Sequence, residues 1–263
     1  MTNRIDSVLN EQPPGLWPFL AAGYPNVEVT AEMLRAMGRL PIRGVEVGFP
    51  FSDPIADGPV IQQAFSEALA KGVRIRQVFD MIAAVRREVE FALLAMVSAS
   101  IVYRLGLAEF VEHAKGAGFD GVIVPDLSLE EAPSLAAVLR EANLGLSMLI
   151  APTTSADRQR RIAETASGFL YYVSVQGTTG ERSALPADLG EQVGRLKTAT
   201  GCRVLVGFGI STPEHVREVC TFADGAIVGS AIVRRIGRLI GEGRRQVEII
   251  EETVRFVGSL AGA

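Results

Sequence analysis

The 263-residue sequence contains few of the residues that mark disulfide-rich or metal-binding proteins. Its two cysteines, Cys202 and Cys220, are too few and too far apart for a disulfide framework or a thiolate metal cluster. Its two histidines, His113 and His215, cannot supply a three-histidine zinc site. The sequence therefore predicts neither a disulfide scaffold nor a histidine-rich metal centre.

Long apolar runs and an excess of one charge are also missing. No stretch approaches the roughly 20 apolar residues that a membrane helix needs. Residues 1–14 lack the apolar segment and the small-residue cleavage site of a signal peptide. With 26 Lys and Arg against 30 Asp and Glu, the net charge is −4, which argues against the basic stripe of a nucleic-acid-binding protein. We expect a cytoplasmic protein without a nucleic-acid or membrane partner.

Apolar residues make up 48% of the chain, enough for a sizeable core. They occur in short runs that alternate with longer amphipathic stretches, and the runs read as strands buried on both faces. The predicted strands are residues 16–23, 44–49, 91–97, 121–126, 145–151, 169–175, 203–209 and 225–229. The predicted helices are residues 27–38, 74–89, 107–117, 129–142, 156–165, 186–200 and 213–221, with another after the last strand.

This alternation predicts an α/β protein with the (β/α)₈ TIM-barrel fold. Eight strand–helix units in 263 residues give about 33 residues per unit, which is typical of such barrels. No linker or low-complexity segment interrupts the pattern, so we predict a single barrel domain over residues 1–263. Residues 5–9 and 244–260 predict extra N-terminal and C-terminal helices. A doubly wound open sheet is the alternative, because periodicity does not show whether a sheet closes.

A glutamate lies within the second predicted strand. Glu46 stands between Val45 and Val47, so strand alternation puts it on the opposite face, alongside Gly48, which would leave space near the carboxylate. If that face is the barrel interior, burial raises the pKa of Glu46 and lets it exchange a proton near neutral pH. A structural ion pair is the weaker interpretation, because a buried charge within an apolar strand usually has a purpose.

A second candidate carboxylate follows in the next loop. Asp57 lies in a segment stiffened by Pro50, Pro54 and Pro59. A rigid loop can support a catalytic carboxylate, and two carboxyl groups in different environments can take different roles. The alternative is that Asp53 and Asp57 cap turns or helices, which we favour for Asp53.

Small residues follow the seventh and eighth predicted strands, in the loops where TIM barrels often bind phosphate. Glycines let backbone N–H groups approach an anion, and a helix N-terminus adds a partial positive charge. We favour a phosphate site here over tight turns alone. The residues concerned are Gly207, Phe208, Gly209, Gly229 and Ser230.

Other features are open or are dismissed. Residues 174–183 are polar, with Gly177 and Gly180 as pivots, and either form a mobile lid or an ordinary surface loop. Residues 116–121 match the dinucleotide pattern G-x-G-x-x-G, but they end a helix and precede a strand, which is the reverse of the required context. His215 could assist an anion, but we expect it to be solvent-exposed. Trp17 and the twelve phenylalanines are interpreted as core.

These segments resemble the tryptophan synthase α chain family. The resemblance rests on residues 18–25, 46–59, 207–211 and 229–233, and it extends over nearly the whole chain. It implies a barrel that cleaves indole-3-glycerol phosphate to indole and glyceraldehyde 3-phosphate without a cofactor. It also implies transfer of indole to a pyridoxal-phosphate β chain in an α₂β₂ complex.

The resemblance assigns roles to individual residues. Glu46 would be the general acid–base that protonates indole C3 and takes the proton of the glycerol hydroxyl. Asp57 would hold and activate the indole N–H. The other implied roles are phosphate binding, ordering of the lid against Asp57 and lining of the ligand pocket. Gly180, Gly209 and Ser230 would bind the phosphate. Thr179 would order the lid, and Tyr171 would line the pocket.

One segment departs from the family pattern. After the third strand the family usually has a methionine followed by aromatic residues and asparagine, which line the indole end and contact the β chain. Here the segment from Met96 to Ile101 has neither tyrosine nor asparagine. Two alternatives therefore stay open: a stand-alone lyase that releases indole without a β chain, and a catalytically weak regulatory subunit. Retention of Glu46 and Asp57 speaks against the second.

Overall fold

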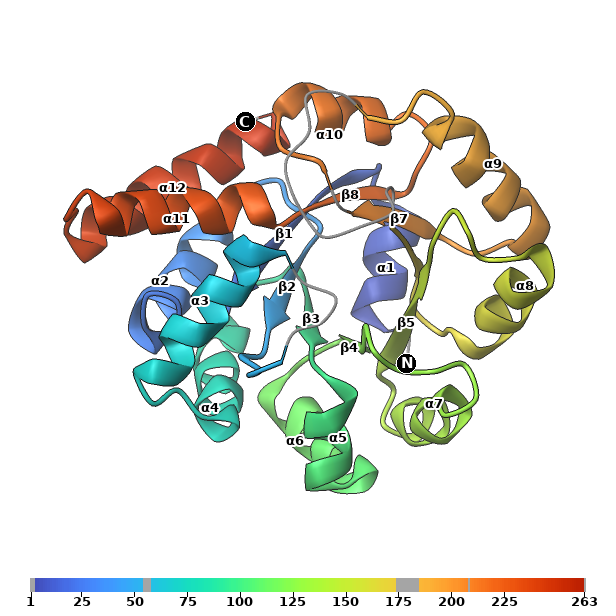
Figure 1. The fold of residues 1–263 in the computed structure, drawn as a ribbon, viewed down its shortest axis with the longest axis horizontal. Coiled ribbons are helices and arrows are strands. Elements are labelled where there is room, and N and C mark those ends of the chain that lie inside the picture. Colours follow the sequence, from blue (N-terminus) through green and yellow to red (C-terminus); the bar gives the residue numbers. More distant parts are fainter. Residues whose placement is uncertain (1–2, 54–57, 174–184, 208, 263) are drawn as a thin grey trace.

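A computed structural model describes residues 3–53, 58–173, 185–207 and 209–262. Eight parallel strands follow one another in chain order and close into a barrel (Figure 1). Closure is direct, because Trp17 in the first strand pairs with Ile227 in the last. The predicted barrel is thus confirmed and the open sheet is excluded. The strands are β1 (Gly15–Ala21), β2 (Gly44–Gly48), β3 (Ala92–Met96), β4 (Gly121–Ile123), β5 (Gly145–Ile150), β6 (Leu170–Val173), β7 (Val204–Gly207) and β8 (Gly225–Val228).

Helices surround the barrel, except that the first lies across its middle (Figure 1). None of the described helices is both long and apolar enough to cross a membrane. The helices are α1 (Arg4–Glu11), α2 (Val27–Met37), α3 (Pro59–Ala70), α4 (Ile75–Val85), the 3₁₀ helix η1 (Arg86–Glu88), α5 (Ala99–Leu105), α6 (Leu107–Ala117), α7 (Ala132–Glu141), α8 (Ala156–Thr165), α9 (Leu189–Thr200), α10 (Pro213–Val219), α11 (Ser230–Gly241) and α12 (Gln246–Ala261).

All eight predicted strands are present, although their ends differ by up to three residues. The largest difference is at β4, which was expected to reach residue 126 and ends at Ile123. Pro125 has no N–H to donate, and the chain already turns where Leu127 N–H donates to the Val124 carbonyl at 3.2 Å. The strand therefore ends early, and Asp126 lies in a loop.

Two helices were not predicted. In α3, Ile61, Ala64 and Phe65 are buried at the spacing of a helix face, and this signal was available in the sequence. The short helix α5 lies in the segment that departs from the family pattern, and Ser98 caps it. The predicted helix 74–89 is also divided, because α4 ends at Val85 and η1 follows.

Helix α1 closes the amino-terminal end of the barrel. Its buried Ile5, Val8 and Leu9 belong to one apolar cluster with residues inside the barrel, including Trp17. A side chain at Gly121, the first residue of β4, would place its Cβ 2.6 Å from Ile5 Cδ1. Glycine there lets the helix approach the strands, so the interior is filled at this end.

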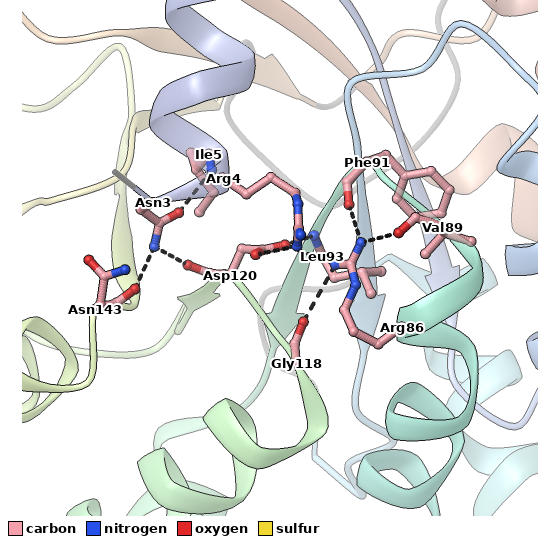
Figure 2. Close-up of polar contacts among 10 residues, drawn as sticks. All are labelled: Asn3, Arg4, Ile5, Arg86, Val89, Phe91, Leu93, Gly118, Asp120 and Asn143. Atoms are coloured by element: carbon pink, nitrogen blue, oxygen red, sulfur yellow. Dashed lines mark hydrogen bonds and ion pairs between the residues drawn. The ribbon is translucent and has the colours of Figure 1, made fainter. Parts of the chain in front are cut away.

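A polar network fixes the same end (Figure 2). The side chain of Asp120, just before β4, accepts hydrogen bonds from the Leu93 N–H at 2.8 Å, from Arg86 at 3.0 Å and from Arg4 at 2.9 Å. Asn3 donates to the Asp120 carbonyl at 2.8 Å. The network joins α1, η1, β3 and β4.

The same construction recurs before β8. Asp224 accepts a hydrogen bond from the Val204 N–H at 2.8 Å and contacts Lys197 at 2.9 Å and Arg203 at 3.2 Å. Arg203 also donates to Asn10 of α1 at 2.8 Å. Helix α1 is therefore held at both of its ends. Arg4 binds Asp120 before β4, and Asn10 binds Arg203, which in turn contacts Asp224 before β8.

Candidate functional site

Glu46 lies at the centre of β2 and faces the interior of the barrel. Its strand neighbours in register are Phe19 and Leu94. The side chain is 0% exposed, and neither carboxyl oxygen has a hydrogen-bond partner among the described residues. Burial raises the pKa of Glu46 well above its ordinary value. The structure therefore places Glu46 inside the barrel, as the sequence predicted, and burial favours its neutral form.

The space expected beside Gly48 is filled by an aromatic ring. A Cβ at Gly48 would lie 2.5 Å from Cζ of Phe19 and 3.0 Å from Cζ of Phe65. The glycine is therefore needed for packing of Phe19 and does not leave an opening. The Cβ of Phe19 lies 3.4 Å, and its ring atoms Cγ and Cδ1 lie 3.6 Å, from the Cβ position of Gly229. Phe19 thus links the wall at Glu46 to the end of β8.

Phe19 is a lining residue that sequence reasoning assigned to the core without distinction. Strand alternation places it on the same face of β1 as Trp17, and that signal identifies an interior position. It does not identify a position at the ligand end. That distinction depends on the register with β2 and β8, where Glu46 pairs with Phe19 and Val228 pairs with Pro18.

Tyr171, the second residue of β6, lies against Gly207, the last residue of β7. Tyr171 is 4% exposed, and a side chain at Gly207 would overlap the phenol ring and its oxygen. Gly207 therefore gives room to Tyr171 on the inner wall. This contact gives Gly207 a packing role, and the lining of a ligand pocket by Tyr171 stays a prediction.

The predicted phosphate residues in the described loops after β7 and β8 include a left-handed glycine and the start of a helix. Gly209 has a φ of +79°, a left-handed conformation that favours glycine. Ser230 is the first residue of α11, and the Gly229 carbonyl accepts from Ile232 N–H at 2.9 Å and Val233 N–H at 3.1 Å. The first two residues of α11, Ser230 and Ala231, come before the residues that make these bonds. Their N–H groups therefore lie at the positive end of this 12-residue helix.

Register relates the carboxylate to this helix start. Glu46 pairs with Phe19, and the β1–β8 ladder continues from Pro18 and Val228 towards Gly229. Glu46 and Gly229 are therefore at the same height on strands separated by β1. Two strand spacings correspond to about 10 Å between their backbones.

Several predicted residues lie outside the described part of the chain. These are Asp57 and the candidate ligand-binding residues Thr179, Gly180 and Phe208, together with the candidate lid segment. The nearby Asp53 is exposed and accepts a hydrogen bond from the side chain of its neighbour, Ser52 Oγ, at 2.6 Å, and its turn-capping role stays a prediction.

The expectation that His215 is exposed is wrong. His215 is 7% exposed and belongs to the buried face of α10 with Val216 and Val219. Thr212 caps this helix by accepting the His215 N–H at 3.2 Å. Packing of α10 on its neighbours decides the burial, which its short sequence pattern does not reveal.

Comparison with known proteins gives a consistent result. A family model described as tryptophan synthase alpha chain matches residues 6–260. A tryptophan synthase alpha chain of Rhodopirellula baltica is 46% identical over 235 residues, covering 88% of this chain and 84% of the relative. One of Prochlorococcus marinus is 41% identical over 237 residues, covering 90% and 88%. The structure of Mycobacterium tuberculosis tryptophan synthase is similar with a TM-score of 0.89 at 30% identity, covering 100% of this chain and 98% of that chain.

Proposed function

This chain belongs to the tryptophan synthase alpha chain family, and we propose that it cleaves indole-3-glycerol phosphate to indole and glyceraldehyde 3-phosphate in tryptophan biosynthesis. The observation that carries the proposal is the state of Glu46. It is a fully buried carboxyl group with a raised pKa and without a hydrogen-bond partner among the described residues. The proposed phosphate residues follow β7 and β8, and β8 is separated from β2 by β1 alone.

The reaction needs a group that both donates and accepts a proton. In its neutral form Glu46 donates a proton to indole C3, which gives the C3-protonated indolium cation and leaves Glu46 as a carboxylate. As a carboxylate it then takes the proton of the adjacent glycerol hydroxyl. The carbon–carbon bond breaks, its electron pair returns to the indole ring and the hydroxyl carbon becomes the aldehyde. A raised pKa lets one residue serve both steps near neutral pH.

Asp57 is proposed as the partner of the indole nitrogen. Protonation at C3 leaves positive charge on that nitrogen, and a carboxylate hydrogen-bonded to the N–H stabilises it. This assignment is supported by the sequence motif from Glu46 to Pro59 and by family membership.

The phosphate is assigned to the opposite side of the pocket. Gly209, Gly229 and Ser230 offer backbone N–H groups and a hydroxyl at the start of α11. Gly180 would complete the phosphate site from the candidate lid, and Thr179 would order that lid against Asp57. Tyr171 and Phe19 would line the wall between the phosphate and the indole ring.

Family membership implies a lyase. We propose more specifically that this chain is a carbon–carbon lyase and that it assembles with a β chain in an α₂β₂ complex. Relatives named tryptophan synthase alpha chain favour this interpretation over a stand-alone enzyme or a regulatory subunit. Among the described residues, no observation supports either alternative.

The test is an assay of indole release from indole-3-glycerol phosphate, with and without a tryptophan synthase β chain. We expect indole in both conditions and a faster rate with the partner. Absence of indole in both would overturn the proposal. A fast rate that the partner does not change would overturn only the proposed assembly.

A further inference from the structure

Backbone hydrogen bonds join the carboxyl ends of β2, β3 and β4. The Phe49 N–H donates to the Met96 carbonyl at 2.8 Å, and the Val97 N–H donates to the Ile123 carbonyl at 3.0 Å. These bonds extend the sheet one step beyond the strands. The wall that contains Glu46 is therefore tied to β3, and β3 is tied to β4.

A side chain continues this connection where the backbone of β4 stops. One oxygen of Asp126 accepts the Ala99 N–H at 2.8 Å, and the other accepts from Ser98 Oγ at 2.7 Å. Ser98 Oγ in turn accepts the Ser100 N–H at 3.2 Å and caps α5. The carboxylate thus holds two consecutive residues after β3 against the loop after β4.

The segment held in this way carries Met96. Met96 is partly buried, belongs to the apolar cluster inside the barrel and pairs in register with Gly48. Two residues earlier on the same face is Leu94, the register partner of Glu46. Met96 therefore lies two residues beyond the register position of Glu46, towards the carboxyl end of the barrel wall.

We propose that Asp126 is a positioning residue for the lyase reaction, acting through Ser98 and Ala99 to fix Met96 beside Glu46. The inference rests on the proposed function. It also accounts for the segment that departs from the family pattern, because Ser98 supplies the hydroxyl that the carboxylate holds. A change at Asp126 would release the end of β3 and shift the inner wall without touching substrate.

A purely structural role predicts a different result. Capping of the seven-residue helix α5 would contribute to stability and leave the turnover of folded enzyme unchanged. Ser128 provides a matched control in the same loop. Its hydroxyl donates to Glu131 at 2.6 Å and accepts the Glu131 N–H at 3.2 Å, so it makes the same kind of cap without contacting β3.

The experiment measures kcat, KM and Tm for Asp126→Ala, Asp126→Asn and Ser128→Ala. For Asp126→Ala we expect kcat to fall at least about tenfold, because small displacements of a reacting geometry are costly. KM should change less than about threefold, since the phosphate is bound from β7 and β8. Asp126→Asn should restore kcat to within about threefold, because its amide can accept from Ala99 and donate to Ser98. Ser128→Ala should keep the wild-type kcat.

Wild-type kcat in Asp126→Ala, or an equal loss in Ser128→Ala, would overturn the inference. If Asp126→Ala does not fold, Ser98→Ala keeps the bond to the Ala99 N–H, and a kcat unchanged in that variant would overturn it equally. Failure of the wild-type enzyme to release indole would instead overturn the proposed function, so the two failures are distinguishable.

Discussion

Two buried carboxyl groups, one at the amino end of the barrel and one at its centre, have opposite surroundings. Burial raises the pKa of Asp120 and of Glu46. For Asp120 the Leu93 N–H and the guanidinium groups of Arg86 and Arg4 oppose that shift. For Glu46, burial is the only cause, and the described residues provide no donor. Asp120 therefore holds neighbouring segments together through its hydrogen bonds, whereas Glu46 has no donor among the described residues that would oppose proton transfer.

The comparison separates stability from activity. At the amino end, the side chains of Arg86 and Asp120 are 13% and 11% exposed, so their ion pair is largely removed from water. Loss of one partner from such a pair leaves the other charge buried and unpaired. At the centre, Glu46 already lacks partners, and its replacement disrupts no bond among the described residues. We therefore expect variants at the two positions to have opposite effects.

The largest expected effect is on turnover in Glu46→Gln. The amide cannot donate and accept a proton, so kcat should fall about 10²- to 10⁴-fold. Glutamine has nearly the same volume, so the free energy of unfolding should change by less than about 1.5 kcal/mol. Steady-state kinetics and urea unfolding measure the two quantities. Near-wild-type turnover would refute the role of Glu46.

Asp120→Asn should show the reverse pattern. We expect the free energy of unfolding to fall by about 2–4 kcal/mol, because Arg86 loses its buried partner. The kcat of the folded enzyme should stay at the wild-type value. Asp224→Asn is the matched control and should cost only about 1–2 kcal/mol, since Lys197 and Arg203 are 33% and 45% exposed. Equal losses in both variants would contradict the importance of the buried pair.

Ser230→Ala tests the phosphate end of the site. Loss of one hydrogen bond to a charged group should raise KM by about tenfold and leave kcat nearly unchanged. Ser259→Ala is a suitable control, because that exposed serine lies in α12 and its hydroxyl donates to the Phe256 carbonyl. A fall in kcat at constant KM would remove Ser230 from the phosphate site.

The smallest expected effect is a pH dependence of stability. The pKa of Glu46 is raised in the folded state, so the folded protein binds a proton more tightly than the unfolded chain. As pH rises above the ordinary value of 4.5, the wild-type enzyme should lose stability until the raised pKa is passed. Glu46→Gln lacks this loss. The Tm of the variant relative to wild type should therefore increase with pH, and a constant difference would show that Glu46 is not buried as described.

Several features of the site follow from local sequence patterns. The apolar runs predict all eight strands, and alternation within residues 44–49 places Glu46 opposite Val45 and Val47. The helix α3 could have been predicted from its apolar spacing. The early end of β4 also has a local cause in Pro125. These features depend on neighbours in the sequence, and short-range patterns contain the necessary information.

Other features depend on residues that are distant in the chain. Phe19 fills the space at Gly48 because β1 and β2 pair in one register, and His215 is buried because α10 packs on its neighbours. The hydrogen bonds to Asp126 come from Ser98 and Ala99, which lie 28 and 27 residues earlier in the chain. Nothing in either segment alone indicates the other as its partner.

By itself, the sequence determined which segments are strands and which face of β2 carries Glu46, because periodicity is a local property of the chain. Only the tertiary structure decided that β1 closes on β8 and that Asp120 receives donors from Arg4, Arg86 and Leu93. It also left Glu46 without any donor among the described residues. The physical reason is that hydrogen-bond partners and burial are supplied by residues far away in sequence, which folding alone brings together.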